Sequence, residues 1–269
     1  PTAAIPLYGR SADNIRDHRH VTSLLHRIET TDTGVLVTPT LSFDERGHQV
    51  NHMTYYCVGW SGNGENPVDF YPTAEDFVGE GGNFERPYAI VKNAEGVKAG
   101  TRIEGLEAVG GLHFSEVTLE PEEECSYLIF TGITEDIQEI RNLSKTYTTR
   151  EMVLEELEKT KAYWQEKVNV AYHTGDSDFN QFMHWVSFQP ILRRIYGCSF
   201  LPHHDYGKGG RGWRDLWQDC LALLIMNPDG VRQMLLDNFA GVRVDGSNAT
   251  IIGSKQGEFV ADRNNITRV

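Results

Sequence analysis

The sequence predicts a chain of two parts, an antiparallel β-sandwich followed by a helical region. Up to residue 147, short runs rich in Val, Thr, Tyr and Phe alternate with clusters of Gly, Asp, Asn and Pro, a pattern typical of antiparallel strands. From residue 148 onward, apolar residues recur at the period of an amphipathic helix. We therefore expect a β-sandwich domain over residues 1–147, a helical linker over 148–174, and a helical domain over 175–269.

Five runs in the first part are predicted to be strands, in a sandwich with one buried face on each sheet. The segment Asp-Glu-Arg-Gly ending at Gly47 is expected to be a hairpin turn, and Pro-Glu-Glu-Glu ending at Glu124 separates the last two strands. The predicted strands are residues 34–43, 50–60, 88–91, 111–119 and 125–132.

Two other segments of this part carry candidate functional side chains. Residues 69–87 are rich in Gly and Pro, which predicts a loop without regular structure. Its aromatic residues Phe70, Tyr71 and Phe77 either pin the loop to the body or stack on a sugar ring, and the sequence favours pinning. Residues 10–28 contain a basic group that suits either an anion or an ordinary polar surface, and the second interpretation is favoured. Its members are Arg16, His18, Arg19 and His20.

Four helices are predicted after residue 147. Thr148 and Glu151 form a capping box for a helix over 152–167. Acidic residues at 176–178 cap a second helix, which Pro190 is expected to bend or split before Gly197. A third helix begins at Trp213, and a fourth runs from residue 228 to about residue 240. The tail from Val242 is rich in Gly, Asn and Ser and is expected to form loops.

The helix from Trp213 has two chemically different sides. Successive residues turn by 100°, so a polar arc of about 140° is predicted opposite an apolar side. An arginine fork, short acids and an amide are groups that hold sugar hydroxyls. The alternative is a face that meets water, with an acid favoured by the helix dipole. The arc contains Arg214, Asp215, Gln218 and Asp219, and the apolar side contains Trp213, Leu216, Trp217, Cys220, Leu221 and Leu224.

Composition narrows the classes of function. A net charge of −13 over 269 residues disfavours nonspecific nucleic-acid binding, and no apolar run is long enough to suggest a membrane role. The cysteines Cys57, Cys125, Cys198 and Cys220 show no C-x-x-C spacing, so we expect buried free thiols in a reducing cytoplasm. The chain lacks an initiator Met and a signal peptide, and we expect it to belong to a longer polypeptide.

Several catalytic motifs are excluded by spacing. The glycines before Gly212 do not fit a P-loop, and no strand is predicted before them for a dinucleotide site. His203 and His204 are adjacent, so on an extended segment they point to opposite sides and do not readily ligate one ion. No nucleophile elbow is present. We therefore expect neither a metal nor an organic cofactor.

Two motifs resemble those of a known enzyme family. The segment Arg-Gly-Trp-Arg-Asp-Leu-Trp-Gln-Asp, residues 211–219, resembles the R-D-x-x-Q-D segment of the inverting cellobiose, chitobiose and β-glucan oligosaccharide phosphorylases. The segment Asp-Phe-Val-Gly-Glu-Gly-Gly, residues 76–82, followed by Pro87, is similar to a loop of their β-domain. The resemblance implies a β-sandwich, a linker helix and an (α/α)6 barrel, of which this chain contains the first part.

The resemblance also implies a reaction. These enzymes use phosphate to cleave a β-glucosidic bond with inversion, which gives α-glucose 1-phosphate and a shortened acceptor, so phosphate is the co-substrate. By this resemblance Arg211, Arg214 and Asp215 hold hydroxyls of the terminal glucose, while Gln218 and Asp219 bind or orient them. The family's general acid is an Asp within a tryptophan-containing motif that is not found here. We expect that acid beyond Val269, no catalytic residue within the chain, and an inactive chain by itself.

Other interpretations of the same residues stay open. A carbohydrate-binding protein without catalysis is one, and a related (α/α)6-barrel hydrolase, which needs a second carboxylate, is another. The expected partners are an oligosaccharide and phosphate, without nucleic acid or membrane, and a homodimer is compatible with the sequence. The linkage of the glucan, β-1,2, β-1,3 or β-1,4, does not follow from these residues.

Overall fold

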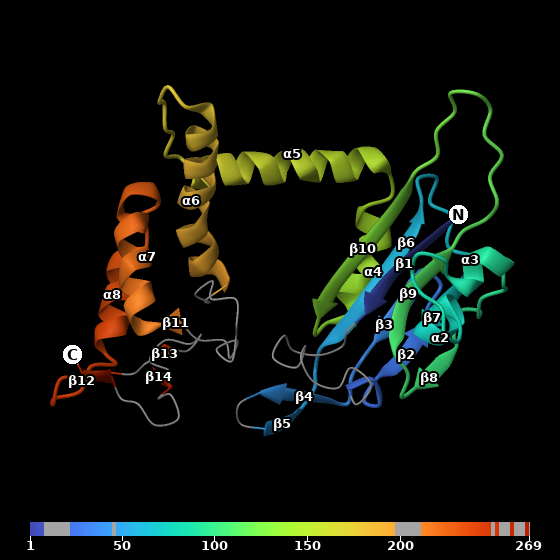
Figure 1. Cartoon of the computed structure of the whole chain (residues 1–269), viewed down its shortest axis with the longest axis horizontal. Coiled ribbons are helices and arrows are strands. Elements are labelled where there is room, and N and C mark those ends of the chain that lie inside the picture. The colour runs from blue at the N-terminus through green and yellow to red at the C-terminus, as the bar shows by residue number, and fades with distance from the viewer. Residues whose placement is uncertain are drawn as a thin grey trace. The chain divides into compact units, whose positions relative to one another are not determined.

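The computed structural model describes the backbone of residues 1–7, 22–44, 47–196 and 211–248, together with short strands at 251–252, 259–260 and 267–268. The chain divides into two compact units, Pro1–Glu156 and Leu157–Val269. Figure 1 labels the elements of both units. Each unit has an apolar core of its own.

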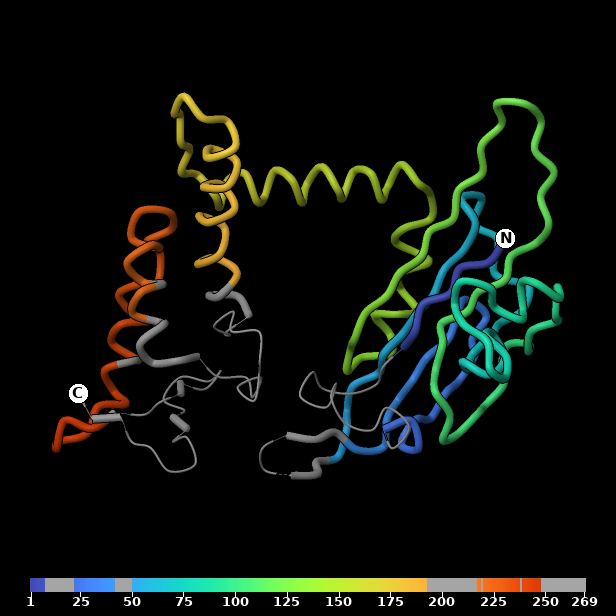
Figure 2. Tube along the Cα trace, viewed as in Figure 1, coloured from blue at the N-terminus to red at the C-terminus, as the bar shows by residue number. Residues whose placement is uncertain are grey.

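The first unit is an antiparallel β-sandwich, as predicted. One sheet has the strand order β1-β9-β7 and the other has the order β10-β6-β3-β2-β8. Neighbouring strands in both sheets run antiparallel. The blue N-terminal segment in Figure 2 runs beside the green β9, with Thr2 paired to His113. The strands are β1 (Thr2–Leu7), β2 (Arg27–Thr30), β3 (Gly34–Val37), β6 (Thr54–Ser61), β7 (Asp69–Thr73), β8 (Arg102–Glu104), β9 (Ala108–His113) and β10 (Tyr127–Thr134).

The facing sides of the two sheets enclose one apolar cluster. Val35 and Cys57 contribute from the five-stranded sheet, and Ala108 and Leu112 contribute from the three-stranded sheet. The sheets come very close at Gly110, where a Cβ atom would stand 2.2 Å from the Cβ of Cys57. A larger residue at Gly110 would therefore push the sheets apart.

Short helices cover the outer side of each sheet, so the sandwich has four layers. On the five-stranded sheet, α4 (Ile137–Thr146) places Ile140 against Val58 and Trp60. On the three-stranded sheet, α2 (Ala74–Val78) and α3 (Tyr88–Lys92) pack on Tyr71 and Val109. The expectation of one buried face per sheet is therefore wrong. Strands buried on both faces need continuous apolar runs rather than alternation, and the four residues of β3 are all buried.

The second unit contains three helices that pack around one cluster. These are α6 (Ser177–Tyr196), α7 (Trp213–Met226) and α8 (Val231–Phe239). Their shared cluster includes Ile191, Leu223 and Val231, which come from the three helices in turn. The short strands form two small sheets, β11-β13-β14 and β12-β15. Their bounds are β11 (Arg211–Gly212), β12 (Ser247–Asn248), β13 (Ile251–Ile252), β14 (Phe259–Val260) and β15 (Thr267–Arg268). The (α/α)6 barrel stays a prediction.

Several strands are shorter than predicted. Residues 34–43 break into β3 and β4 (Leu41–Asp44), and β4 pairs with β5 (Gly47–Val50) across the predicted hairpin turn. The pairing of Asp44 with Gly47 confirms the hairpin, although the two residues between them lie outside the described residues. The strand predicted over residues 50–60 begins only at Thr54, because Asn51 makes side-chain hydrogen bonds to Pro39 O and Met53 O. The strand predicted over 111–119 ends at His113.

The strand predicted over residues 88–91 is wrong, because these residues form helix α3. Pro87 precedes it with φ −66°, which suits the start of a helix, and Asn93 ends it in the left-handed conformation with φ 47°. Ala89 is buried, whereas Ile90 and Val91 are exposed. The apolar residues that suggested a strand therefore have no buried sheet position to fill.

Residues 69–87 are also more regular than predicted. They contain the fully buried strand β7 and helix α2, although turn residues dominate the rest of the segment. Phe70, Tyr71 and Phe77 are all buried, which confirms the interpretation that these aromatic residues pin the segment to the body. The basic group at residues 16–20 lies outside the described residues.

The helix expected over residues 152–167 is confirmed as α5 (Arg150–Lys167), but its cap is shifted by one residue. The Met152 amide donates to the Thr149 hydroxyl at 3.5 Å, whereas the Thr148 hydroxyl donates to the sulfur of Met152. Helix α6 begins as expected, since Asp176 accepts hydrogen bonds from the amides of Asp178 and Phe179. Pro190 does not split α6, which continues to Tyr196. The tail beyond Val242, predicted as loops, contains β12 to β15.

Candidate functional site

The backbone places the predicted sugar-binding residues on one strand and the helix that follows it. Arg211 lies in β11, where it pairs with Ile252 of β13. Helix α7 begins at Trp213, as predicted, so the other predicted residues occupy its first two turns. The pairing with β13 was missed, because two adjacent isoleucines within a glycine-rich tail are too short a signal for a strand.

The side chains of the predicted site are described only in part. Gln218 is exposed, while the side chains of Arg211, Arg214, Asp215 and Asp219 lie outside the described ones. Their proposed contacts with a sugar therefore stay predictions.

The packed side of α7 differs from the predicted one. Cys220, Leu223 and Met226 are buried, and Trp217 contacts Phe239 of α8 edge to face, with ring centroids 4.6 Å apart. Leu221 and Leu224 were assigned to the packed side but are 68% and 53% exposed. Ten of the fourteen residues of α7 are apolar, so the apolar band is too wide for the helical period to predict which edge of it packs against other helices.

The second family motif, residues 76–87, has a clear structural basis. The Thr73 hydroxyl accepts a hydrogen bond from the Asp76 amide at 3.0 Å and donates to the Asp76 carboxylate at 2.7 Å, which caps α2. Gly79 follows with φ +80°, and a Cβ atom there would stand 2.6 Å from the Cβ of Tyr88. The motif residues therefore shape the chain between α2 and α3.

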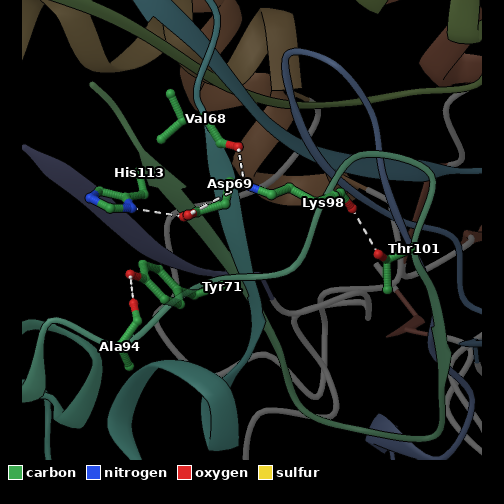
Figure 3. Close-up of polar contacts among 7 residues, drawn as sticks. All are labelled: Val68, Asp69, Tyr71, Ala94, Lys98, Thr101 and His113. Atoms are coloured by element: carbon green, nitrogen blue, oxygen red, sulfur yellow. Dashed lines mark hydrogen bonds and ion pairs between the residues drawn. The ribbon is translucent and has the colours of Figure 1, made fainter. Parts of the chain in front are cut away.

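Beside this motif, a buried carboxylate joins two strands of the three-stranded sheet (Figure 3). Asp69 in β7 lies opposite His113 in β9 and accepts a hydrogen bond of 2.8 Å from its Nδ1. The Lys98 ammonium lies 3.9 Å from the other carboxylate oxygen and donates to Val68 O at 3.1 Å. The buried charge of Asp69 is thus met by two partners, as burial of a carboxylate requires.

The same cluster extends to α3 through an aromatic ring. The Tyr71 ring stacks on the His113 imidazole, and its hydroxyl donates to Ala94 O at 2.6 Å. Burial, followed by the nearby Asp69 charge, raises the pKa of Tyr71, so this hydroxyl stays a donor at neutral pH. The cluster therefore ties β7, β9 and the segment after α3 together. Sequence reasoning missed it because Asp69 and His113 are 44 residues apart.

The thiols only partly match their prediction. Cys57 and Cys220 are buried free thiols, as expected, whereas Cys125 is exposed. Cys125 lies on the long connection between β9 and β10, away from the sheet interior. Cys198 lies outside the described residues.

The described part of the chain shows neither a metal site nor a membrane-spanning helix. Among these residues, no three His, Cys, Asp or Glu side chains come together as metal ligands. None of the helices described here combines the length and apolar character that a bilayer-spanning helix needs.

An antiparallel β-sandwich followed by helices is the part of the architecture implied by the phosphorylase resemblance that the structure shows. Residues 10–150 match the supersandwich domain of glycosyl hydrolase 94, and the chain belongs to this family. The match confirms the resemblance seen in the sequence, and it contains the motif at residues 76–87.

A relative gives a more specific comparison. The chain is 27% identical over 203 residues to the cyclic beta-(1,2)-glucan synthase NdvB of Rhizobium meliloti (strain 1021). The aligned part is 71% of this chain but 6% of that relative. The chain thus spans a small part of the length of NdvB.

Proposed function

We propose that this chain is part of an inverting phosphorylase that acts on β-linked gluco-oligosaccharides. The observation that carries the proposal is membership of the glycosyl hydrolase 94 family over residues 10–150. The R-D-x-x-Q-D segment, which lies within α7 directly after β11, supports a sugar site in the second unit. The products would be α-glucose 1-phosphate and an oligosaccharide shortened by one glucose.

The proposed reaction needs few groups from the protein. Phosphate oxygen attacks the anomeric carbon from the face opposite the leaving oxygen, the glucosidic bond breaks, and one general acid protonates that oxygen. Phosphate is already an anionic nucleophile, so the base that an inverting hydrolase uses to activate water is not required. Within this proposal Arg211, Arg214 and Asp215 hold the terminal glucose, Gln218 and Asp219 bind or orient it, and phosphate is a co-substrate without a further cofactor.

The substrate to test first is β-1,2-linked glucan, because NdvB is by its name a synthase of cyclic β-(1,2)-glucan. Phosphorolysis is reversible, so a phosphorylase that cleaves this glucan would also extend it from glucose 1-phosphate. We therefore infer two directions of one reaction, cleavage with phosphate or extension with glucose 1-phosphate. A panel of β-1,2, β-1,3 and β-1,4 glucobioses and longer oligomers, incubated in each direction, identifies the linkage and the favoured direction.

The decisive variant is Asp215→Ala in the polypeptide that supplies the general acid. A hydrogen bond to a charged group contributes about 1.5–3 kcal/mol, which corresponds to a loss of kcat/KM of roughly 10- to 150-fold. Steady-state release of glucose 1-phosphate measures the loss, and a thermal melt shows whether the fold is retained. Asp229→Ala is the matched control, because Asp229 is an exposed acid of the same unit.

Three outcomes would count against the proposal. Unchanged kcat/KM in Asp215→Ala removes the sugar-binding assignment, and lost activity with a collapsed melt makes Asp215 a structural residue. Release of glucose without any need for phosphate would identify a hydrolase instead. The 269-residue chain by itself is expected to catalyse no phosphorolysis, because the tryptophan-associated acid motif is not found in it.

A further inference from the structure

A cavity of about 350 Å³ lies in the sandwich unit, whereas the predicted sugar-binding residues belong to the second unit. Three segments that are distant in sequence form its walls: the turn after β6, the connection between β9 and β10, and the first turn of α5. Its volume is at the lower end of the range for small-molecule pockets, which suits a mono- or disaccharide. Its lining includes Ser61, Glu65, Phe114, Tyr127, Arg150 and Glu151.

One wall of the cavity is aromatic. The Phe114 and Tyr127 rings pack against each other with centroids 4.6 Å apart, and Phe114 is buried. The Tyr127 hydroxyl oxygen accepts a hydrogen bond from the Cys125 thiol at 3.8 Å, which leaves its own proton to donate. Burial raises the pKa of Tyr127, with Cys125 and Glu65 adding to the effect, so the hydroxyl stays protonated. An aromatic body with a polar tip is a common platform for a sugar ring.

The turn after β6, which also lines the cavity, is held in place by hydrogen bonds within the turn. The Ser61 amide donates to Glu65 O at 2.8 Å, and the Ser61 hydroxyl accepts from the Glu65 amide at 3.0 Å. The backbone that carries the Glu65 side chain is therefore ordered before any ligand arrives. Pre-ordering of this kind lowers the entropic cost of binding.

The start of α5 contributes a cation and a carboxylate to the lining. Arg150 lies 3.6 Å from Glu124, with side chains 55% and 83% exposed. Exposed ion pairs of this kind contribute little to stability, so Arg150 can leave Glu124 for a ligand at little cost. Hydrogen bonds from its own amide and from the Thr149 hydroxyl lower the pKa of Glu151. Glu151 is therefore an ionised acceptor at neutral pH, and Arg150 is a donor that a ligand can recruit.

These groups favour a neutral ligand with many hydroxyls. A pyranose has hydroxyl groups and an apolar face. Its hydroxyls can donate hydrogen bonds to the carboxylates and accept them from the arginine, while its apolar face can stack on the aromatic residues. An anion is disfavoured, because Glu65, Glu123, Glu124 and Glu151 outnumber Arg150 in the lining. A bound metal is disfavoured, since the described residues contain no three-ligand cluster.

We propose that this cavity is a second, non-catalytic site that binds one or two glucose units of a β-linked glucan. Such a site would hold the glucan on the sandwich while its end is processed elsewhere. The choice of glucose as the sugar rests on the proposed function, whereas the preference for a neutral polyhydroxylated ligand rests on the cavity itself.

Ligand-observed NMR on the 269-residue chain tests the proposal with β-1,2-, β-1,3- and β-1,4-linked glucobioses. The chain carries Asp215→Ala, so that the predicted donor site does not contribute, and circular dichroism checks that each variant is folded. We expect saturable binding with a Kd on the order of millimolar. Arg150→Ala and Glu65→Gln should each weaken it about tenfold or more, while Arg141→Ala and Glu116→Gln, which change exposed residues outside the lining, should not.

Two further measurements avoid dependence on these variants. Ser115→Trp places a large ring on an exposed lining position and should abolish binding while the fold is kept. Cys125 is exposed and lines the cavity, so a saturating glucobiose should slow its alkylation. Absence of saturable binding, or binding that survives both Ser115→Trp and Arg150→Ala, overturns the proposal.

The outcome is separable from that of the proposed function. Sugar binding here without phosphorolysis in any polypeptide would support this cavity and remove the phosphorylase assignment. Phosphorolysis that depends on Asp215, without sugar binding in this cavity, would support the phosphorylase assignment and remove the proposed second site.

Discussion

Cys57 lies where the two sheets of the sandwich come closest, and burial raises the pKa of its thiol to about 12, from 9.0. In the unfolded chain the thiol ionises near its ordinary pKa. Between these two values the folded protein holds one proton more than the unfolded chain. Stability therefore falls as the pH rises through this window.

We expect Cys57→Ala to remove part of this alkaline loss of stability. Wild type should lose up to about 1.4 kcal/mol more per pH unit than Cys57→Ala between about pH 9 and 12. Urea unfolding at pH 8, 9, 10 and 11 with a reductant measures the difference. Val35→Ala is the control, because Val35 is a fully buried residue of the same cluster that carries no titrating group, so its loss should lower stability at every pH and leave the pH dependence unchanged. Parallel curves for wild type and Cys57→Ala would contradict the assignment.

Two glycines with nearly the same positive φ differ in their steric surroundings. Gly64 and Gly79 have φ of +83° and +80°, but a Cβ atom at Gly64 meets nothing within 4 Å, whereas one at Gly79 meets Tyr88. Gly64→Ala should cost about 1–2 kcal/mol for the left-handed backbone. Gly79→Ala should cost about 1–3 kcal/mol more, because ψ 168° places Gly79 in a backbone region essentially restricted to glycine and because the packed neighbour must also move. Equal losses in urea unfolding would show that α3 shifts freely away from α2.

At the scale of the elements, two variants can show which threonine caps helix α5. The predicted box assigned the cap to Thr148, whereas the Met152 amide bonds to the Thr149 hydroxyl. Thr149→Ala should therefore destabilise the chain by about 0.5–2 kcal/mol, and Thr148→Ala by no more than about 0.5 kcal/mol. Chemical denaturation measures the free energy of unfolding of both variants and shows which threonine is the cap. The larger loss in Thr148→Ala would restore the capping box predicted from the sequence.

At the scale of the whole molecule, the two compact units have separate cores. Leu112 belongs to the core of the sandwich and Leu223 to that of the helical unit, and both are fully buried. Leu→Ala at either position should cost about 2–5 kcal/mol. Hydrogen exchange read by mass spectrometry should show lost protection within residues 1–156 for Leu112→Ala, and within 157–269 for Leu223→Ala. A uniform loss across the chain would show that the units unfold as one.

Local signals in the sequence determined the general architecture. Turn residues at Gly47 and the change of period near residue 148 predicted the hairpin and helix α5, because these features depend on neighbours a few residues away. The start of α7 at Trp213 was predicted on the same basis. The family resemblance was visible as well, because its motifs are short continuous segments.

Tertiary structure alone decided which surfaces are buried and which distant groups meet. Residues 88–91 form a helix despite their strand-like composition, and α7 packs through Leu223 rather than Leu221. Asp69 meets His113, and the cavity on the sandwich is assembled from three separate segments. Periodicity records the preference of a segment for helix or strand, whereas burial depends on which other segments supply the opposite surface. That information lies in contacts between residues far apart in the chain.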